Sequence, residues 1–236
     1  MRYCVETHSG RGAGHHVLSC VSEVKNVRKP KIVGLTGGIA TGKSPVSAQL
    51  RSLGAHIIDA DAAARTVLAK GSEGLAAVAE AFGPDIVQAD GTLDRKKLAG
   101  IIFADAAARR RLDAITHPRI YKHMQTELEA KMKDPDAAVI VLDIPLLFET
   151  GLFLDIIDES VVVYADRDTQ LARLMARDKL TRVEAEKRIA AQMPIEEKVK
   201  LADRIIDNSG SVGATAKQVA KLWKEWVTDE HCPHCP

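Results

Sequence analysis

Short apolar runs alternate with helix-like stretches along most of the chain. Five runs rich in β-branched residues predict strands at 31–35, 56–58, 138–142, 160–165 and 204–206. The runs AVIVL (138–142) and SVVVYA (160–165) are apolar at consecutive positions, which is typical of strands buried on both faces of a parallel sheet. Apolar residues three or four positions apart predict helices between the strands. The alternation therefore predicts an α/β fold, with a parallel sheet and flanking helices.

Two helical stretches do not fit the simple alternation. Residues 62–137 lie between neighbouring strands and are almost entirely helix-like, although one crossover needs only about a dozen residues. They predict an inserted helical domain, with breaks at Gly71, Gly74, Gly83–Pro84, Gly91 and His117–Pro118. Residues 178–202 predict a charged helical segment, either a solvated hairpin or a mobile lid that brings cations to a phosphate. The core then comprises residues 30–61, 138–177 and 203–228.

Both ends of the chain lie outside this pattern. Residues 1–29 have no sustained period and no apolar stretch of the kind that a secretory signal requires, so we expect a disordered leader or a misassigned start. Their arginines leave an organelle transit peptide open, although the two glutamates argue against one. The tail 229–236 holds Cys232 and Cys235 in a C-x-x-C spacing, and one such pair is weak evidence for redox chemistry or a zinc site.

The composition is that of a globular protein and excludes several classes. Of 236 residues, 46% are hydrophobic and 28% are charged, which suffices for a buried core. Lys and Arg number 33 and Asp and Glu 32, so the net charge of +1 lacks the basic excess of a dedicated nucleic-acid binder. No apolar run approaches the roughly 20 residues of a membrane helix, and four cysteines make no disulfide scaffold. We therefore expect a cytoplasmic protein without nucleic-acid or membrane partners, while the oligomeric state stays open.

The strongest motif is GGIATGKS (37–44), which matches G-x-x-x-x-G-K-[ST] and lies between a predicted strand and a predicted helix. Glycines allow the backbone to approach a phosphate, and successive N–H groups together with the helix N-terminus bind its oxygens. The lysine reaches the β- and γ-phosphates, and the serine hydroxyl binds Mg²⁺. The pattern predicts a P-loop NTPase-type fold that binds a nucleoside triphosphate with Mg²⁺ through Gly38, Ile39, Ala40, Thr41, Gly42, Lys43 and Ser44.

Three kinds of nucleotide-binding protein share this loop: small-molecule kinases, regulatory GTPases and ATPases coupled to movement. A GTPase needs a guanine-reading N-K-x-D, which the sequence lacks. The helical insertion suggests a second substrate pocket, and the charged segment suggests a lid. Together they favour a kinase that closes over two substrates and excludes water.

Several motifs in order closely resemble the dephospho-CoA kinase family, over a stretch from Lys31 to Val227. They are GLTGGIATGKS (34–44), IIDADAAAR (57–65), THPRI (116–120), LDIPLLFETGL (142–152), YADRDTQLARLMARD (164–178), RIAAQM (188–193) and DNSGS (207–211). The resemblance implies transfer of the γ-phosphate of ATP to the ribose 3′-hydroxyl of dephospho-CoA, giving CoA and ADP. It also implies a core, a CoA-binding helical domain and a lid. Two alternatives stay open: another small-metabolite or nucleoside kinase, and a non-catalytic NTP-binding regulatory protein.

Two acidic residues follow the second predicted strand, at the sheet edge where open α/β sheets bind substrates. The resemblance places the family's active-site aspartate at Asp61, as the base or orienting acceptor for the attacking hydroxyl. The alternative is that Asp61 caps the helix predicted at 62–69. If Asp61 instead acts on the hydroxyl, Asp59 is the structural member of the pair. Lys43 and Arg173 complete the expected catalytic set, Arg173 because the resemblance places a phosphate-contacting arginine there.

Other candidates each carry two interpretations. Asp143 ends a buried strand and is expected to hold Mg²⁺ through water together with Ser44, or else to be a turn residue. Arg65 and His117 contact the substrate, or are respectively a surface residue and the mark of a helix kink at Pro118. Asn208 borders the adenine or lies in a plain turn. Arg177 and Arg188 are further lid candidates that are equally well explained as solvated charges.

The chain departs from the family at two positions of the loop. Pro45 stands where the family usually has Thr, and proline offers neither a hydroxyl nor an N–H to the α-phosphate. We therefore expect weaker ATP binding than in a relative with Thr. Ala40 replaces a common Gly, although the motif does not require Gly there.

Overall fold

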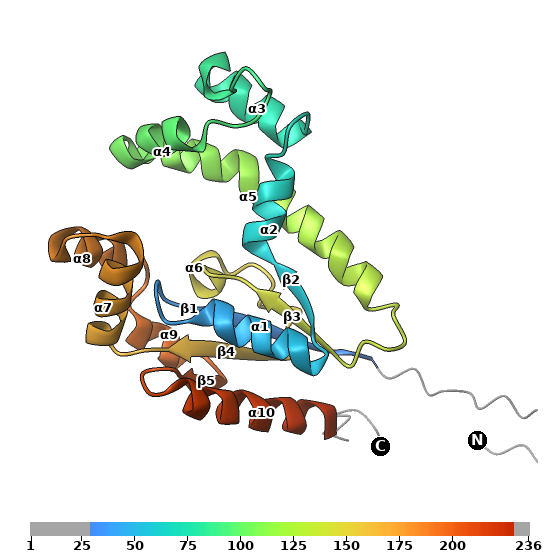
Figure 1. The fold of residues 1–236 in the computed structure, drawn as a ribbon. Helices are drawn as coiled ribbons and strands as arrows, with labels where there is room; N and C mark the ends of the chain where they lie inside the picture. The colour runs from blue at the N-terminus through green and yellow to red at the C-terminus, as the bar shows by residue number, and fades with distance from the viewer. Residues whose placement is uncertain (1–28, 229–236) are drawn as a thin grey trace, which may run out of the picture.

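The computed structural model describes residues 29–228 and contains one five-stranded sheet in which every neighbouring pair is parallel. The strand order is β2-β3-β1-β4-β5, which places β1 at the centre (Figure 1). The strands are β1 (Lys31–Gly37), β2 (His56–Asp59), β3 (Val139–Asp143), β4 (Glu159–Tyr164) and β5 (Arg204–Asp207). The predicted parallel α/β fold is confirmed. The expectations for the leader up to residue 28, and for Cys232 and Cys235, lie outside the described residues.

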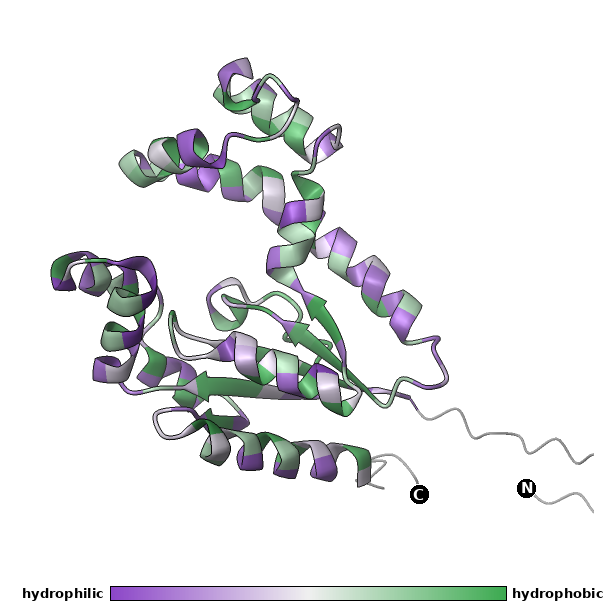
Figure 2. Cartoon of the chain, viewed as in Figure 1, coloured by the Kyte–Doolittle hydropathy of each residue, from purple (hydrophilic) through white to green (hydrophobic). Residues whose placement is uncertain are grey.

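Helices cover both faces of the sheet, so the core has two layers. Alternate residues of each strand point to opposite faces, as Val139 and Val141 do against Ile140 and Leu142. On one face they pack under α1 (Lys43–Leu53) and α10 (Val212–Thr228), and on the other under α6 (Leu147–Thr150) and the second half of α5 (Ala106–Lys131). Figure 2 shows hydrophobic strands between helices whose outer sides are polar, the pattern expected of a sheet with helices on both faces.

The inserted helices build a hydrophobic core of their own, away from the sheet (Figure 1). They are α2 (Ala60–Val67), α3 (Glu73–Phe82), the short 3₁₀ helix η1 (Pro84–Ile86), α4 (Arg95–Ala104) and the first half of α5. Leu75, Val78, Ile86 and Leu98 are buried in this core, and Leu112 of α5 packs against them. The insertion is therefore tied to the sheet by two helices, α2 and α5.

Two of the helix breaks predicted from the sequence are wrong. Gly74 lies in the first turn of α3, where a Cβ would overlap the carbonyl oxygen of Val67, so close packing and not a break explains this glycine. Helix α5 runs through Pro118 without ending, although proline cannot donate to the preceding turn. The kink expected at His117–Pro118 therefore does not end the helix.

The charged segment 178–202 divides into two parts with different surroundings. Helices α7 (Arg167–Asp178) and α8 (Arg182–Ala190) pack on each other and project beside the carboxyl ends of the strands (Figure 1). Helix α9 (Ile195–Leu201) instead packs against β4, with Lys198 fully buried. Within 178–202, α8 therefore projects from the core whereas α9 belongs to it, and a lid at 178–202 stays a prediction. No helix within residues 29–228 is long and apolar enough to cross a membrane.

One buried carboxylate joins the sheet to the last helix. Glu159 of β4 lies 2.8 Å from Lys31, accepts a hydrogen bond from Arg204 over 2.6 Å and accepts another from the Trp226 indole over 2.9 Å. Burial acts to raise the pKa of Glu159, but the hydrogen bonds from these three side chains outweigh it and lower the pKa. The ionised form therefore stabilises the fold, and this contribution is lost as the pH falls through the lowered pKa.

We predict that Glu159→Gln lowers the free energy of unfolding at pH 7 by roughly 1–3 kcal/mol, because a buried charge-assisted network loses its anion. The difference from wild type should shrink below about pH 4.3, where glutamates become protonated. Urea unfolding of both proteins across pH tests this. Glu225→Gln, at a more exposed partner of Arg204, serves as the control and should cost less than about 1 kcal/mol. A difference that stays constant with pH would contradict the assignment.

Candidate active site

The phosphate loop connects β1 to α1 at the carboxyl edge of the sheet (Figure 1). Thr41 closes a tight turn inside it, because its N–H and its hydroxyl both donate to the Gly38 carbonyl, over 3.3 and 2.9 Å. Gly42 caps α1 with φ of 91°, and a Cβ at this position would overlap the Asn208 amide. Ala40 has φ of 60°, a conformation that costs a residue with a Cβ about 1–2 kcal/mol. Glycine would adopt this conformation without that cost.

Asn208 and Arg173 hold the outer side of this loop. The Asn208 side-chain amide donates to the Thr41 carbonyl over 2.7 Å, and its oxygen accepts from the Thr215 hydroxyl over 2.7 Å. Arg173 of α7 donates to the Asn208 carbonyl over 2.9 Å and reaches the Thr41 carbonyl at 3.5 Å. The structure thus brings both residues to the loop, with the guanidinium close to Gly42.

Lys43 forms an ion pair with Asp143, the last residue of β3. Asp143 is only 4% exposed, and the strand register sets it beside Asp59 of β2. Burial raises the pKa of Asp143, and the ion pair with Lys43 and a hydrogen bond from Ser47 offset this only in part. The pair places the loop's cation and a buried carboxylate at one point of the sheet edge.

The residues at this point suit a hard cation that also binds phosphate oxygens. The Ser44 hydroxyl is exposed in the first turn of α1, and Asp143 supplies carboxylate oxygens. Among residues 29–228 no three His, Cys, Asp or Glu side chains gather in a way that would hold a metal alone. Mg²⁺ ordinarily takes one or two protein oxygens, the remainder coming from water and substrate phosphates. The donor set therefore fits Mg²⁺ that arrives with a nucleotide.

Asp59 and Asp61 have different roles. The Asp59 carboxylate caps α2 by accepting from the N–H groups of Asp61 and Ala62, over 2.8 and 3.2 Å. The capping alternative for Asp61 is therefore wrong. The Asp61 carboxylate is exposed and has no hydrogen bond or ion pair with the described part of the chain. Its carboxylate is thus available to a ligand.

Arg65 and His117 lie further out, on helices that pack on each other. Arg65 is one helical turn beyond Asp61 on α2, with its side chain 61% exposed and 3.9 Å from Asp59. His117 lies on α5, 3.6 Å from Asp113. Within the described residues no hydrogen bond or ion pair links His117 to Asp61 or Lys43. Among the other lid candidates, Arg177 and Arg188 both pair with Asp178 instead of the loop.

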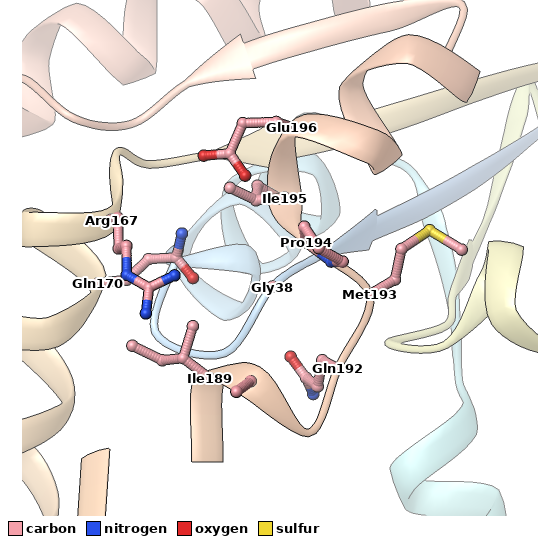
Figure 3. A pocket seen from close by; sticks show the side chains of 10 residues that line it. Gly38, Arg167, Gln170, Ile189, Gln192, Met193, Pro194, Ile195 and Glu196 are labelled. Atoms are coloured by element: carbon pink, nitrogen blue, oxygen red, sulfur yellow. The ribbon is translucent and has the colours of Figure 1, made fainter. Parts of the chain in front are cut away.

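Three residues that the sequence analysis did not single out also contact or support the loop: Glu149, Gln192 and Lys198. Figure 3 shows the linker 192–194 and α9 beside Gly38, where they line a pocket with α7 and α8. The sequence offered one weak signal for the burial of Lys198. Lys198 lies three positions after Ile195 and therefore shares its buried helix face.

Comparison with known proteins identifies the family. Residues 31–214 match the family model described as dephospho-CoA kinase. The chain belongs to the dephospho-CoA kinase family. This confirms the resemblance carried by the motifs.

Relatives of this family match along nearly their whole length. A dephospho-CoA kinase of Geobacter metallireducens is 50% identical over 196 residues, which cover 83% of this chain and 96% of the relative. A dephospho-CoA kinase of Geobacillus kaustophilus is 47% identical over 194 residues, which cover 82% of this chain and 96% of the relative. The solved structure of dephospho-CoA kinase from Campylobacter jejuni has a TM-score of 0.63 at 31% identity, covering 82% of this chain and 96% of that one.

Pro45 is one of the two positions at which the loop departs from the family, and its place in α1 explains why proline is tolerated there. It is exposed in the first turn of α1, where an N–H has no partner within the helix. We predict that Pro45→Thr lowers the KM for ATP by about tenfold, because a hydroxyl can then donate to an anionic phosphate. Steady-state kinetics with varied ATP test this, with Pro45→Ala as the control that removes the ring without adding a hydroxyl. An unchanged KM in Pro45→Thr would show that the missing hydroxyl is irrelevant.

Proposed function

We propose that this site carries out the reaction of its family, the last step of coenzyme A biosynthesis. ATP phosphorylates the ribose 3′-hydroxyl of dephospho-CoA, giving CoA and ADP. The observation that carries this function is the match of residues 31–214 to the dephospho-CoA kinase family. The geometry supports it, because a phosphate loop, a buried carboxylate and a free carboxylate lie at one edge of the sheet.

Binding and neutralising phosphate is assigned to the loop and two cations. The backbone N–H groups of Gly38, Ala40, Gly42, Lys43 and Ser44 bind the ATP phosphates, whereas those of Ile39 and Thr41 donate to Gln192 and Gly38 and support the loop. The Lys43 side chain reaches the β- and γ-phosphates. Arg173, held at the loop by Asn208, is positioned to neutralise charge that spreads over the transferring phosphoryl group. Asn208 also borders the adenine in this proposal.

Asp61 accepts or orients the proton of the attacking 3′-hydroxyl. Its exposed carboxylate at the carboxyl end of β2 supports this role, since substrates of open α/β sheets bind at such ends. Asp143, through water, and Ser44 would hold Mg²⁺, which when bound neutralises phosphate charge. Arg65 and His117, on the helices that connect the insertion, contact dephospho-CoA.

A cytoplasmic location and the absence of a nucleic-acid partner remain predictions. Their support is the near-neutral charge of the whole chain. The match to relatives along almost their full length supports a small-molecule kinase and not a regulatory protein.

One assay separates this function from its alternatives. ADP release from ATP is measured with dephospho-CoA, with a panel of nucleosides and without an acceptor. We expect release that depends on dephospho-CoA. Release with nucleosides would indicate another kinase, and no acceptor-dependent release would indicate an NTP-binding protein without this activity.

We predict that Lys43→Ala lowers turnover about 10²- to 10³-fold, because a preorganised cation at the transferring phosphate is lost. The variant also leaves Asp143 without its ion pair, so its urea unfolding must be measured alongside. Turnover within about threefold of wild type, in a folded variant, would rule out the assigned role.

We predict that Asp61→Asn lowers turnover at least about 10²-fold, because the amide cannot take a proton from the hydroxyl. ATP affinity and the free energy of unfolding should stay close to wild type, since Asp59 and not Asp61 caps the helix. Asp155→Asn, another exposed carboxylate, is the matched control and should keep full turnover. Unfolding of Asp61→Asn instead of loss of turnover would assign Asp61 a structural role.

A further inference from the structure

Lys198 of α9 is a fully buried lysine at the base of the lid. Its ammonium donates to the carbonyls of Gly37 and Pro145, over 3.3 and 2.9 Å, and lies 2.8 Å from the Glu149 carboxylate. An ammonium has three donors and no acceptor, so these three oxygens satisfy it fully. A buried charge is costly unless it is paired in this way, which makes a purely space-filling role a poor explanation.

The linker between α8 and α9 is fastened to the same place. The Gln192 side-chain oxygen accepts the N–H of Ile39 over 2.8 Å, and the Met193 N–H donates to Glu149 over 3.3 Å. Figure 3 shows Gln192, Met193 and Pro194 following one another past Gly38. The phosphate loop is thus bound by both ends of one short segment.

These contacts fix the direction of peptide groups in the loop. In a planar trans peptide the carbonyl oxygen and the next N–H point in opposite directions. Lys198 holds the Gly37 carbonyl toward α9, and so turns the Gly38 N–H away from it. Gln192 sets the neighbouring peptide by holding the N–H of Ile39, whose side chain packs with α7 and α8.

We propose that Lys198 and Gln192 are positioning residues that hold the phosphate loop in its ATP-binding shape and tie it to the lid. Neither side chain needs to touch ATP for this effect, and Lys198 cannot because it is fully buried. The inference rests on the proposed role of the loop in binding ATP. It adds that ATP affinity depends on a segment about 150 positions later in the chain.

Two variants and a control test this proposal. Gln192→Ala should raise the dissociation constant for ATP about 3- to 10-fold, and Lys198→Met about 10- to 100-fold. The KM for dephospho-CoA should change less than about twofold in Gln192→Ala, which a general loss of structure would not produce. Lys200→Met removes an exposed lysine of the same helix, paired only with Glu197 in the described chain, and should bind ATP as wild type does.

Hydrogen exchange without nucleotide provides a second readout that does not depend on catalysis. Amides of residues 37–44 should exchange faster in Gln192→Ala and Lys198→Met, and Gln192→Glu, which keeps an acceptor, should restore slow exchange. If Lys198→Met fails to fold, Gln192→Ala alone decides. Wild-type ATP affinity and exchange in Gln192→Ala would overturn the proposal. Failure of the loop's own function would show instead as unchanged ATP affinity in Lys43→Ala.

Discussion

The carbonyl oxygens of the phosphate loop need donors on the side that faces away from phosphate, and the rest of the site is arranged around this need. Thr41 receives donors from Asn208 and Arg173, and Gly37 receives one from Lys198. These donors lie 132 to 167 positions later in the chain. The loop is a short local motif, but its shape depends on the whole fold.

The strand order makes these distant contacts feasible. Because β1 is central, β3 and β4 lie on either side of it, and residues that follow their carboxyl ends are close enough to contact the loop. Asp143 follows from β3, and Asn208 follows from β5, where its N–H donates to the Tyr164 carbonyl at the end of β4. The near-zero net charge of the chain therefore hides a local separation, with cations around the loop and carboxylates beside it.

The sequence predicted the features whose cause is local. Each strand was recognisable as an apolar run, and the loop as a spacing of glycine, lysine and serine, since both depend on neighbours in the chain. The role of Asp59 as a cap and the passage of α5 through Pro118 were less accessible from the sequence. The first depends on where α2 begins, and the second on the packing of α5 in two cores on either side of the proline. Lys198 was missed because the oxygens that compensate its buried charge come from other elements. They belong to Gly37, Pro145 and Glu149.

Helix α5 belongs to two hydrophobic cores at once. Leu112 and Ile115 pack in the core of the insertion, whereas Met124 and Leu128 pack under the sheet. An excision of the insertion at its sequence limits would consequently strip one face of the sheet of its cover. Grafting a foreign substrate domain onto this scaffold would have to join inside α5, between those two pairs of residues, and keep the helical phase across the junction.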